Sequence, residues 1–188
     1  MVFMYQHANS LPKIWLMTDE RNDSLLENTI RKLPRHSGVI FRHYHLQEGA
    51  RVERFAKLKM LARKHHHLIL LADRPSLARK WGADGVHGRH WKRQETIGLL
   101  HSAPIHNEKE IRQAQHNGAD IFFVSPVFTT RSHPESKPLN NLQLRRLNDL
   151  CGRPVVLLGG MDRQRFTCKR HLKAHGWAAI DALSQKNF

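Results

Sequence analysis

Acidic residues are scarce in this chain of 188 residues: 16 Asp and Glu stand against 31 Lys and Arg, and the formal net charge at pH 7 is +15. Such an excess of positive charge favours partners or substrates that carry phosphate or other anionic groups. The sequence lacks a dense basic tail, however, and no aromatic residues are interleaved with the basic ones as a nucleic-acid-binding platform requires. We therefore expect phosphorylated small molecules as ligands and regard nucleic acid as a remote alternative.

Cysteine and long apolar runs are also rare. The two cysteines, Cys151 and Cys168, cannot build a disulfide framework or a metal site of their own, so we expect small buried thiols. The longest apolar run, residues 68–72, is far shorter than the roughly 18 residues that a membrane span needs. The first ten residues contain no Lys or Arg and no apolar core of a signal peptide. These absences predict a cytoplasmic protein without a membrane partner.

Short apolar runs of strand length alternate with segments of helical spacing along the chain. We predict eight strands, at residues 14–17, 39–41, 68–72, 85–87, 99–105, 121–127, 155–158 and 178–183. One of the intervening helical stripes consists of Val52, Phe55, Leu58, Leu61 and Ala62. Alternating strands and helices build parallel sheets that helices cover. A closed (β/α)8 TIM barrel and an open doubly wound sheet both satisfy this pattern, and the count of eight favours the barrel.

The chain is short for such a barrel, which usually needs about 200 residues or more. Two shortened segments explain the small number of residues: the region 85–105 is compressed, and only residues 184–188 follow the last predicted strand. We therefore predict a single domain, residues 1–188, with a reduced or missing last helix. The missing helix would leave apolar barrel wall exposed near Leu11, Trp177 and Phe188. A second copy of the chain would cover that wall, so a homodimer is possible.

In such a barrel, ligands bind at the carboxyl ends of the strands and in the loops that follow them. Gly159 and Gly160 come directly after the seventh predicted strand, where backbone N–H groups can approach a phosphate without a Cβ in the way. The segment 125–134 contains four hydroxyl side chains together with Arg131 and His133. It can donate several hydrogen bonds to an anion and close over a ligand. These two loops predict a phosphate site.

Asp73 ends a strongly apolar strand. A carboxylate in that position must be paired, bind a metal or face solvent. Its neighbour Arg74 offers an ion pair, whereas a Mg²⁺ ion bound to a diphosphate needs only one or two protein carboxylates. The residues alone leave both interpretations open.

Five segments carry further motifs: residues 14–21 (Ile-Trp-Leu-Met-Thr-Asp-Glu-Arg), 71–74 (Leu-Ala-Asp-Arg), 82–87 (Gly-Ala-Asp-Gly-Val-His), 125–133 (Ser-Pro-Val-Phe-Thr-Thr-Arg-Ser-His) and 154–161 (Pro-Val-Val-Leu-Leu-Gly-Gly-Met). In this order they resemble the motifs of the superfamily that contains thiamine-phosphate synthase and the TenI-type thiazole tautomerase, which are small (β/α)8 barrels. The resemblance extends over nearly the whole chain.

The resemblance implies a transferase that joins hydroxymethylpyrimidine diphosphate to thiazole phosphate and releases diphosphate, in thiamine biosynthesis. Mg²⁺ and cationic side chains would stabilise the departing diphosphate. The resemblance assigns catalytic roles to Arg42 and His133 and metal binding to Asp73. It assigns phosphate or substrate binding to His87, Thr130, Arg131, Ser132, Gly159 and Gly160.

Several positions depart from the family pattern around the diphosphate. Ile40 and Tyr44 replace the glutamine and lysine of its Gln-x-Arg-x-Lys clamp, and Ala72 replaces the asparagine before the metal-binding aspartate. Residues 88–92 contain no acid where the family has its second Mg²⁺ ligand. We therefore expect Mg²⁺ to arrive bound to the diphosphate.

Two other departures concern the remaining chemistry. Asp181 replaces a small serine in the last phosphate loop and would repel phosphate if it faced inward. Pro126 stands where the tautomerase has its catalytic histidine. The alternatives to a divergent synthase are a TenI-like or other small-molecule enzyme of the family and a non-catalytic relative that binds phosphorylated ligands.

Overall fold

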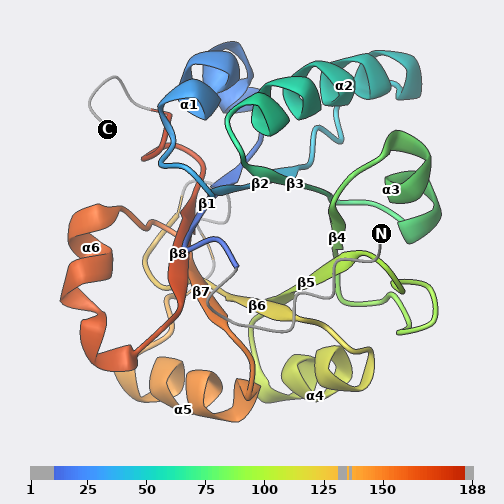
Figure 1. Ribbon diagram of the computed structural model, residues 1–188. Coiled ribbons are helices and arrows are strands. Elements are labelled where there is room, and N and C mark those ends of the chain that lie inside the picture. Colours follow the sequence, from blue (N-terminus) through green and yellow to red (C-terminus); the bar gives the residue numbers. More distant parts are fainter. Residues whose placement is uncertain (1–10, 131–134, 136, 185–188) are drawn as a thin grey trace.

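The computed structural model describes residues 11–130, 135 and 137–184. Eight parallel strands follow one another in sequence order around a closed barrel (Figure 1), which confirms the barrel and excludes the open sheet. The strands are β1 (Ile14–Met17), β2 (Gly38–Phe41), β3 (Leu68–Leu71), β4 (Gly85–His87), β5 (Leu100–Ile105), β6 (Ile121–Val124), β7 (Val155–Leu158) and β8 (Gly176–Ala179).

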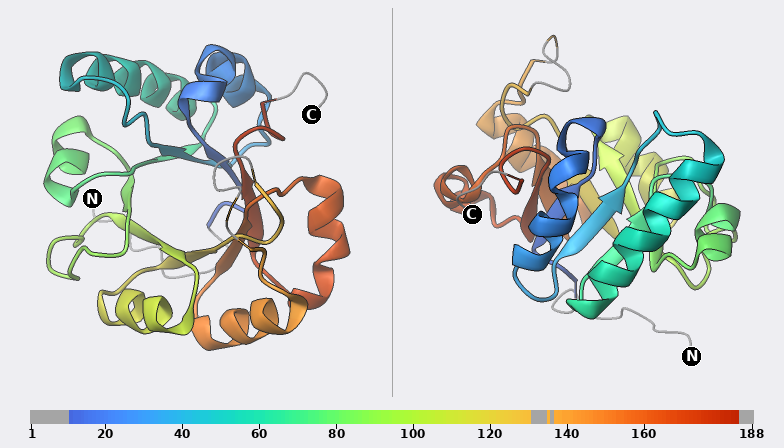
Figure 2. Two further views of the ribbon diagram at one scale, coloured as in Figure 1. Left: turned by 180° about the vertical axis from the view of Figure 1, so that it is seen from behind. Right: turned by 90° about the horizontal axis from the view of Figure 1, so that it is seen from above.

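Helices surround the barrel on the outside (Figures 1 and 2). They are α1 (Leu26–Lys32), α2 (Glu48–Lys64), α3 (Pro75–Trp81), α4 (Glu108–His116), α5 (Asn141–Cys151) and α6 (Arg163–Cys168), with two 3-10 helices, η2 (Glu20–Leu25) and η3 (Arg170–Leu172). Between β4 and β5 the chain forms turns instead of a helix, as the compressed region predicted. The described residues after β8, 180–184, also form a turn and no helix.

The core has two layers because side chains alternate between the two faces of each strand. In β1, Trp15 and Met17 belong to the cluster inside the barrel, whereas Leu16 belongs to the layer under the helices. The Trp15 ring meets the edge of Phe123 from β6, with 5.3 Å between ring centroids. Gly38 begins β2 because a Cβ there would lie 2.2 Å from the Trp15 ring. One large aromatic residue thus fills the barrel's interior at the level of the strand starts.

Two predicted strands, the sixth and the eighth, have bounds that differ from the structure by more than one residue. The eighth strand begins at Gly176 because the N–H of Trp177 bonds the carbonyl of Lys13 at 2.9 Å, and a turn closed from Ser184 to Asp181 follows it. The sixth strand ends at Val124 instead of residue 127, since Pro126 has no N–H with which to continue the ladder.

The expected exposure of the barrel wall was also wrong at two residues. Leu11 is 7% exposed and Trp177 is 3% exposed, because both pack into the core clusters. Phe188 lies outside the described residues. The homodimer therefore stays a prediction, which sedimentation at micromolar concentration would test.

The two cysteines differ in environment. Cys151 is buried as expected, and burial raises the pKa of its thiol to about 12. Cys168 is exposed, contrary to the prediction, because α6 contributes no buried side chain. Among the described residues, no helix is both long and apolar enough to cross a membrane.

Candidate active site

A cavity of about 1180 Å³ opens at the carboxyl ends of the strands, and we call it the mouth. Five residues that the sequence predicted for catalysis or binding line it: Arg42, His87, Thr130, Gly159 and Gly160. They come from loops that are far apart in sequence and that barrel closure brings to one end. Asp73 does not line the mouth, and Arg131, Ser132 and His133 lie outside the described residues.

The glycine pair after β7 forms a tight turn on the wall of the mouth. Gly159 has φ +99° and Gly160 has φ +59°, in the region that L-residues rarely adopt. A Cβ on Gly160 would lie 2.7 Å from the carbonyl oxygen of Thr129 and 2.9 Å from the Cβ of Phe128. Among the described residues, no acceptor takes the N–H of either glycine. These donors suit an oxyanion such as phosphate.

Four arginines make the wall of the mouth cationic: Arg42, Arg89, Arg163 and Arg165. Neighbouring residues hold Arg42 in place, because its Nε donates to the carbonyl of Thr18 at 2.9 Å and its Nη2 to Asp19 at 2.6 Å. Its Nη1 has no partner among the described residues. Arg42 therefore presents a fixed donor for an anion at the end of β2.

Arg89 and Arg165 were not singled out from the sequence. Arg89 forms an ion pair with Glu110 at 2.6 Å, and Arg165 donates to the carbonyl of Gly160 and lies over the Phe128 ring at 4.9 Å. Both could have been predicted from the sequence as residues of the mouth, because they follow β4 and β7 and the connections after strands line the mouth of a barrel.

Two carboxylates also reach this wall. Asp162 caps α6 by accepting the N–H of Arg165 at 2.7 Å, so its charge has a structural use. Asp181 lines the mouth, in the inward position considered from the sequence. It forms an ion pair with Arg21, whose Nη1 lies 3.7 Å from Asp181 Oδ2. The anion-binding part of the wall therefore lies at the glycine pair and the arginines, away from Asp181.

His87 lines the mouth as a neutral side chain. Its Nδ1 is 2.9 Å from Ser102 Oγ, and Ser102 gives its single proton to the carbonyl of Val86 at 3.1 Å. His87 Nδ1 is therefore the donor in that contact, and Nε2 carries a lone pair. Burial, with a contribution from Arg42, lowers the pKa of His87 to about 3. The side chain offers an acceptor to a substrate N–H or O–H, and the assignment of His87 to phosphate or substrate binding stays a prediction.

This low pKa predicts a pH-dependent stability. An unfolded histidine has a pKa of about 6.5, so between pH 6.5 and 3 the unfolded chain binds a proton that folded His87 does not. The contribution of neutral His87 to the free energy of unfolding is complete above pH 6.5 and is lost as the pH falls through this window. In urea unfolding, the free energy of unfolding should fall between pH 7 and pH 5 by on the order of 2 kcal/mol less in His87→Gln than in the wild type. The exposed His116→Gln is the control, and equal pH dependence in both variants would contradict the assignment.

Asp73 is held by Arg51, a residue of α2 that is 8% exposed. Arg51 Nη1 lies 2.5 Å from Asp73 Oδ2, and the N–H of Arg74 donates to Oδ1 at 2.7 Å. The other Arg51 donors reach the carbonyls of Arg42, at 2.9 and 3.1 Å, and of Ala72, at 3.3 Å. Asp73 is therefore ion-paired, as one interpretation of the sequence expected, but its partner is Arg51 instead of Arg74.

These contacts decide whether the residues present fit a resident Mg²⁺ ion. Mg²⁺ needs oxygen ligands in near-octahedral geometry. Both oxygens of Asp73 are engaged, and the Arg51 guanidinium fills the space between Asp73 Oδ2 and the carbonyls of Arg42 and Ala72. The described part of the chain contains no cluster of three or more His, Cys, Asp or Glu that could hold a metal. The residues do not fit a resident Mg²⁺.

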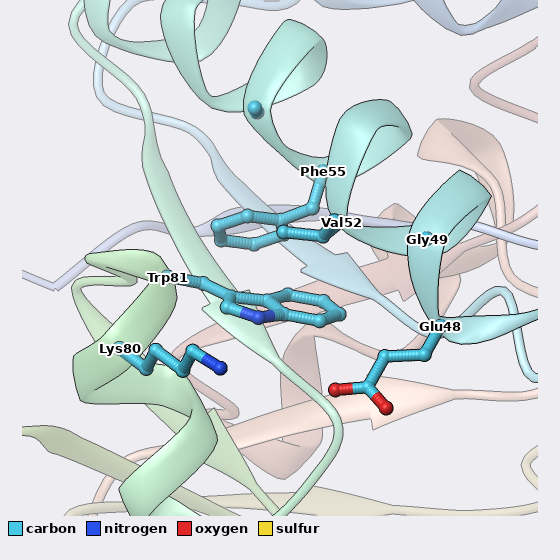
Figure 3. Close-up of a pocket in the computed structure, with 7 residues that line it drawn as sticks. Glu48, Gly49, Val52, Phe55, Lys80 and Trp81 are labelled. Atoms are coloured by element: carbon cyan, nitrogen blue, oxygen red, sulfur yellow. The ribbon is translucent and has the colours of Figure 1, made fainter.

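A second, smaller groove of about 350 Å³ lies between α2 and α3 on the outer wall. Figure 3 shows Phe55 and Val52 facing the indole of Trp81, with Glu48 and Lys80 near its edges. The groove shares no lining residue with the mouth. It is separate from the candidate active site.

Comparison with known proteins agrees with this architecture. The family model described as thiamine monophosphate synthase matches residues 15–183. A putative thiamine-phosphate synthase 2 of Aquifex aeolicus is 25% identical over 90% of this chain and 96% of its own length. A thiamine-phosphate synthase of Latilactobacillus sakei is 30% identical over 69% of this chain and 62% of its own length.

Among solved structures, a thiamine phosphate pyrophosphorylase from Pyrococcus furiosus superposes with a TM-score of 0.78 at 20% identity. The match covers 96% of this chain and 91% of that one, and it supports the fold. Because the family model matches almost the whole barrel, the chain belongs to the thiamine monophosphate synthase family.

Proposed function

We propose that this protein is a thiamine-phosphate synthase-like transferase, which joins hydroxymethylpyrimidine diphosphate to thiazole phosphate and releases diphosphate. The observation that carries the proposal is the pair of N–H groups at Gly159 and Gly160, which have no acceptor among the described residues and lie on a wall that also holds four arginines. Two phosphorylated substrates need such positive potential. The cavity volume of about 1180 Å³ is adequate for two small molecules.

In the proposed reaction, the bond between the pyrimidine methylene carbon and the diphosphate oxygen breaks, and its electron pair leaves with the diphosphate. The thiazole nitrogen gives its lone pair to that carbon, so a C–N bond forms without an oxidant. Catalysis then depends on placing the two substrates and stabilising the charge on the leaving group.

We assign the two phosphate groups to different parts of the mouth. Gly159, Gly160 and Thr130 would bind the thiazole phosphate. Arg42 would face the leaving diphosphate, with His133 and its neighbours Arg131 and Ser132 as the proposed contributions of the loop after β6. His87 Nε2 would accept a hydrogen bond from a substrate and thereby orient it. Mg²⁺ enters this proposal only as part of the diphosphate substrate.

The second candidate is a non-catalytic relative that binds phosphorylated ligands. The ion pair between Arg51 and Asp73 favours it, because a guanidinium fixed by backbone carbonyls leaves the carboxylate unable to take part in metal chemistry. A TenI-like tautomerase has less support, since Pro126 stands at the position of its catalytic histidine.

An assay with both thiamine precursors distinguishes these candidates. A synthase should form thiamine phosphate and diphosphate only when both precursors are present. Asp73→Asn should leave the Mg²⁺ dependence of turnover unchanged, because Asp73 is engaged with Arg51. No turnover, together with a rise in the unfolding temperature on addition of thiazole phosphate, would favour the binding relative. Neither turnover nor stabilisation would overturn the proposal.

A further inference from the structure

The charge of this protein is unevenly distributed along the barrel axis. All 16 acidic residues lie within the described part of the chain, so the location of every carboxylate is known. Thirteen salt bridges are formed among the described residues. In each of them the carboxylate belongs to a loop that follows a strand or to the first turn of a helix, at the mouth end. The carboxylates that form ion pairs are therefore gathered at the mouth end, where the four arginines of the wall outnumber its two carboxylates, Asp162 and Asp181.

The opposite end of the barrel, which we call the base, consists of the connections that lead into the strands. Exposed basic residues occur on these connections around the ring: Lys13 before β1, Arg35 before β2, Arg93 before β5, Arg153 before β7 and Lys173 before β8. Because the strands close in sequence order, these connections are arranged around the barrel axis at the end where the strands begin. The right-hand view of Figure 2 shows the strands and helices from the side.

None of these five side chains forms an ion pair or hydrogen bond with the described residues. Lys32 and Lys64 add two exposed bases in the last turns of α1 and α2. Bases in a last turn are ordinary because they complement the helix dipole. Of the bases in the connections, Arg93 and Arg153 interact electrostatically with Asp120, without an ion pair or hydrogen bond.

The few carboxylates at the base do not neutralise this face. Asp84 and Asp120 are half-buried and accept the N–H groups of Ile69 and His101, each at 2.8 Å. These two acids thereby anchor the starts of β3 and β5. Two exposed acids also lie near this end, Glu95 in the connection before β5 and Asp149 in the last turn of α5. The base therefore keeps a net positive charge that faces solvent.

We propose that the base binds the phosphate backbone of double-stranded nucleic acid, independently of base sequence. Unpaired lysines and arginines without a built pocket suit a run of phosphates. Single strands need stacking platforms, and the exposed aromatic residue that the structure describes, Tyr44, lies at the mouth. An anionic membrane would require an apolar anchor as well, and in the described part of the base the exposed large apolar residues, Ile97 and Leu150, lie singly on different elements.

The inference is tested with two matched triple variants of the full chain. The base variant is Arg35→Gln/Lys64→Gln/Arg153→Gln, and the control is Lys109→Gln/Arg112→Gln/Arg145→Gln. Both remove three exposed positive charges, and the control residues lie away from the base. Binding to labelled duplex DNA and duplex RNA, about 20 base pairs each and of two unrelated sequences, is measured between 50 and 200 mM KCl.

The wild-type protein should bind all duplexes, and its affinity should fall steeply with salt. The base variant should bind at least about tenfold more weakly at 100 mM KCl, and its salt slope should decrease by roughly 2 to 3. The control should change the affinity by less than about twofold.

Equal weakening in both variants would overturn the proposal, because net charge alone would then explain binding. Absence of duplex binding at 50 mM KCl would overturn it too. Tighter binding of the wild type to phosphatidylserine vesicles, lost in the base variant, would assign the face to a membrane instead. Turnover should be unchanged in both variants, so this inference and the proposed function can fail separately.

Discussion

Replacing Gly160 with alanine is expected to weaken the binding of thiazole phosphate by roughly 10- to 100-fold. The new Cβ would lie 2.7 Å from the carbonyl oxygen of Thr129 and 2.9 Å from the Cβ of Phe128, so the turn must move. The φ of +59° adds strain for any L-residue. A shifted turn no longer aims its N–H at the ligand, and a hydrogen bond to a charged group contributes about 1.5–3 kcal/mol. Calorimetric titration with thiazole phosphate measures this loss.

Gly152→Ala is the matched control for that substitution. Gly152 has φ +58°, close to that of Gly160, but no atom lies within 4 Å of the position that its Cβ would take. Both variants should therefore lose stability from the strained backbone, by about 1–2 kcal/mol in urea unfolding. Only Gly160→Ala should lose affinity. Similar affinities in the two variants would show that the phosphate binds elsewhere.

Replacing Arg51 with methionine is expected to destabilise the protein by on the order of 3 kcal/mol and to make it responsive to Mg²⁺. The substitution leaves the Asp73 carboxylate and the carbonyls of Arg42 and Ala72 facing the space of the lost guanidinium. A partly buried carboxylate without its partner accounts for the destabilisation. The three oxygen atoms that border the vacated space are ligands of the kind that a hard divalent cation takes. Mg²⁺ should then stabilise the variant in urea unfolding and leave the wild type unaffected.

The double variant Arg51→Met/Asp73→Asn completes this experiment. Without the carboxylate, the Mg²⁺ effect should disappear, and part of the lost stability should return because no unpaired charge remains. Mn²⁺ binding followed by electron paramagnetic resonance gives a second readout that does not depend on turnover. Equal stabilisation of the wild type and Arg51→Met by Mg²⁺ would contradict the view that Arg51 occupies the cation position.

The structure differs from sequence-based expectation most clearly along α2. The predicted apolar stripe included Val52 and Leu61, yet both are only partly buried. The buried face consists of Arg51, Phe55, Leu58 and Ala62, which share one side of the helix. From the sequence, the charged Arg51 was not counted as part of the core-facing stripe, although it lies four residues before Phe55 and therefore on the same side of the helix. Arg51 tolerates this position because its donors have carbonyl and carboxylate partners and three aromatic rings lie within 5.9 Å.

The sequence by itself determined the alternation of strands and helices and the glycine pair after the seventh strand, whereas its count of eight strands favoured a barrel that only the structure confirmed. These features depend on local periodicity and backbone freedom, which neighbouring residues encode. Only the tertiary structure decided that Asp73 pairs with Arg51, that His87 is neutral and that the unpaired bases collect at one end. Such outcomes depend on contacts between residues far apart in the chain, such as Asn22 with Ser184 at 3.2 Å across the closure of the barrel. Burial and charge pairing are set by these distant neighbours, and no local pattern in the chain specifies them.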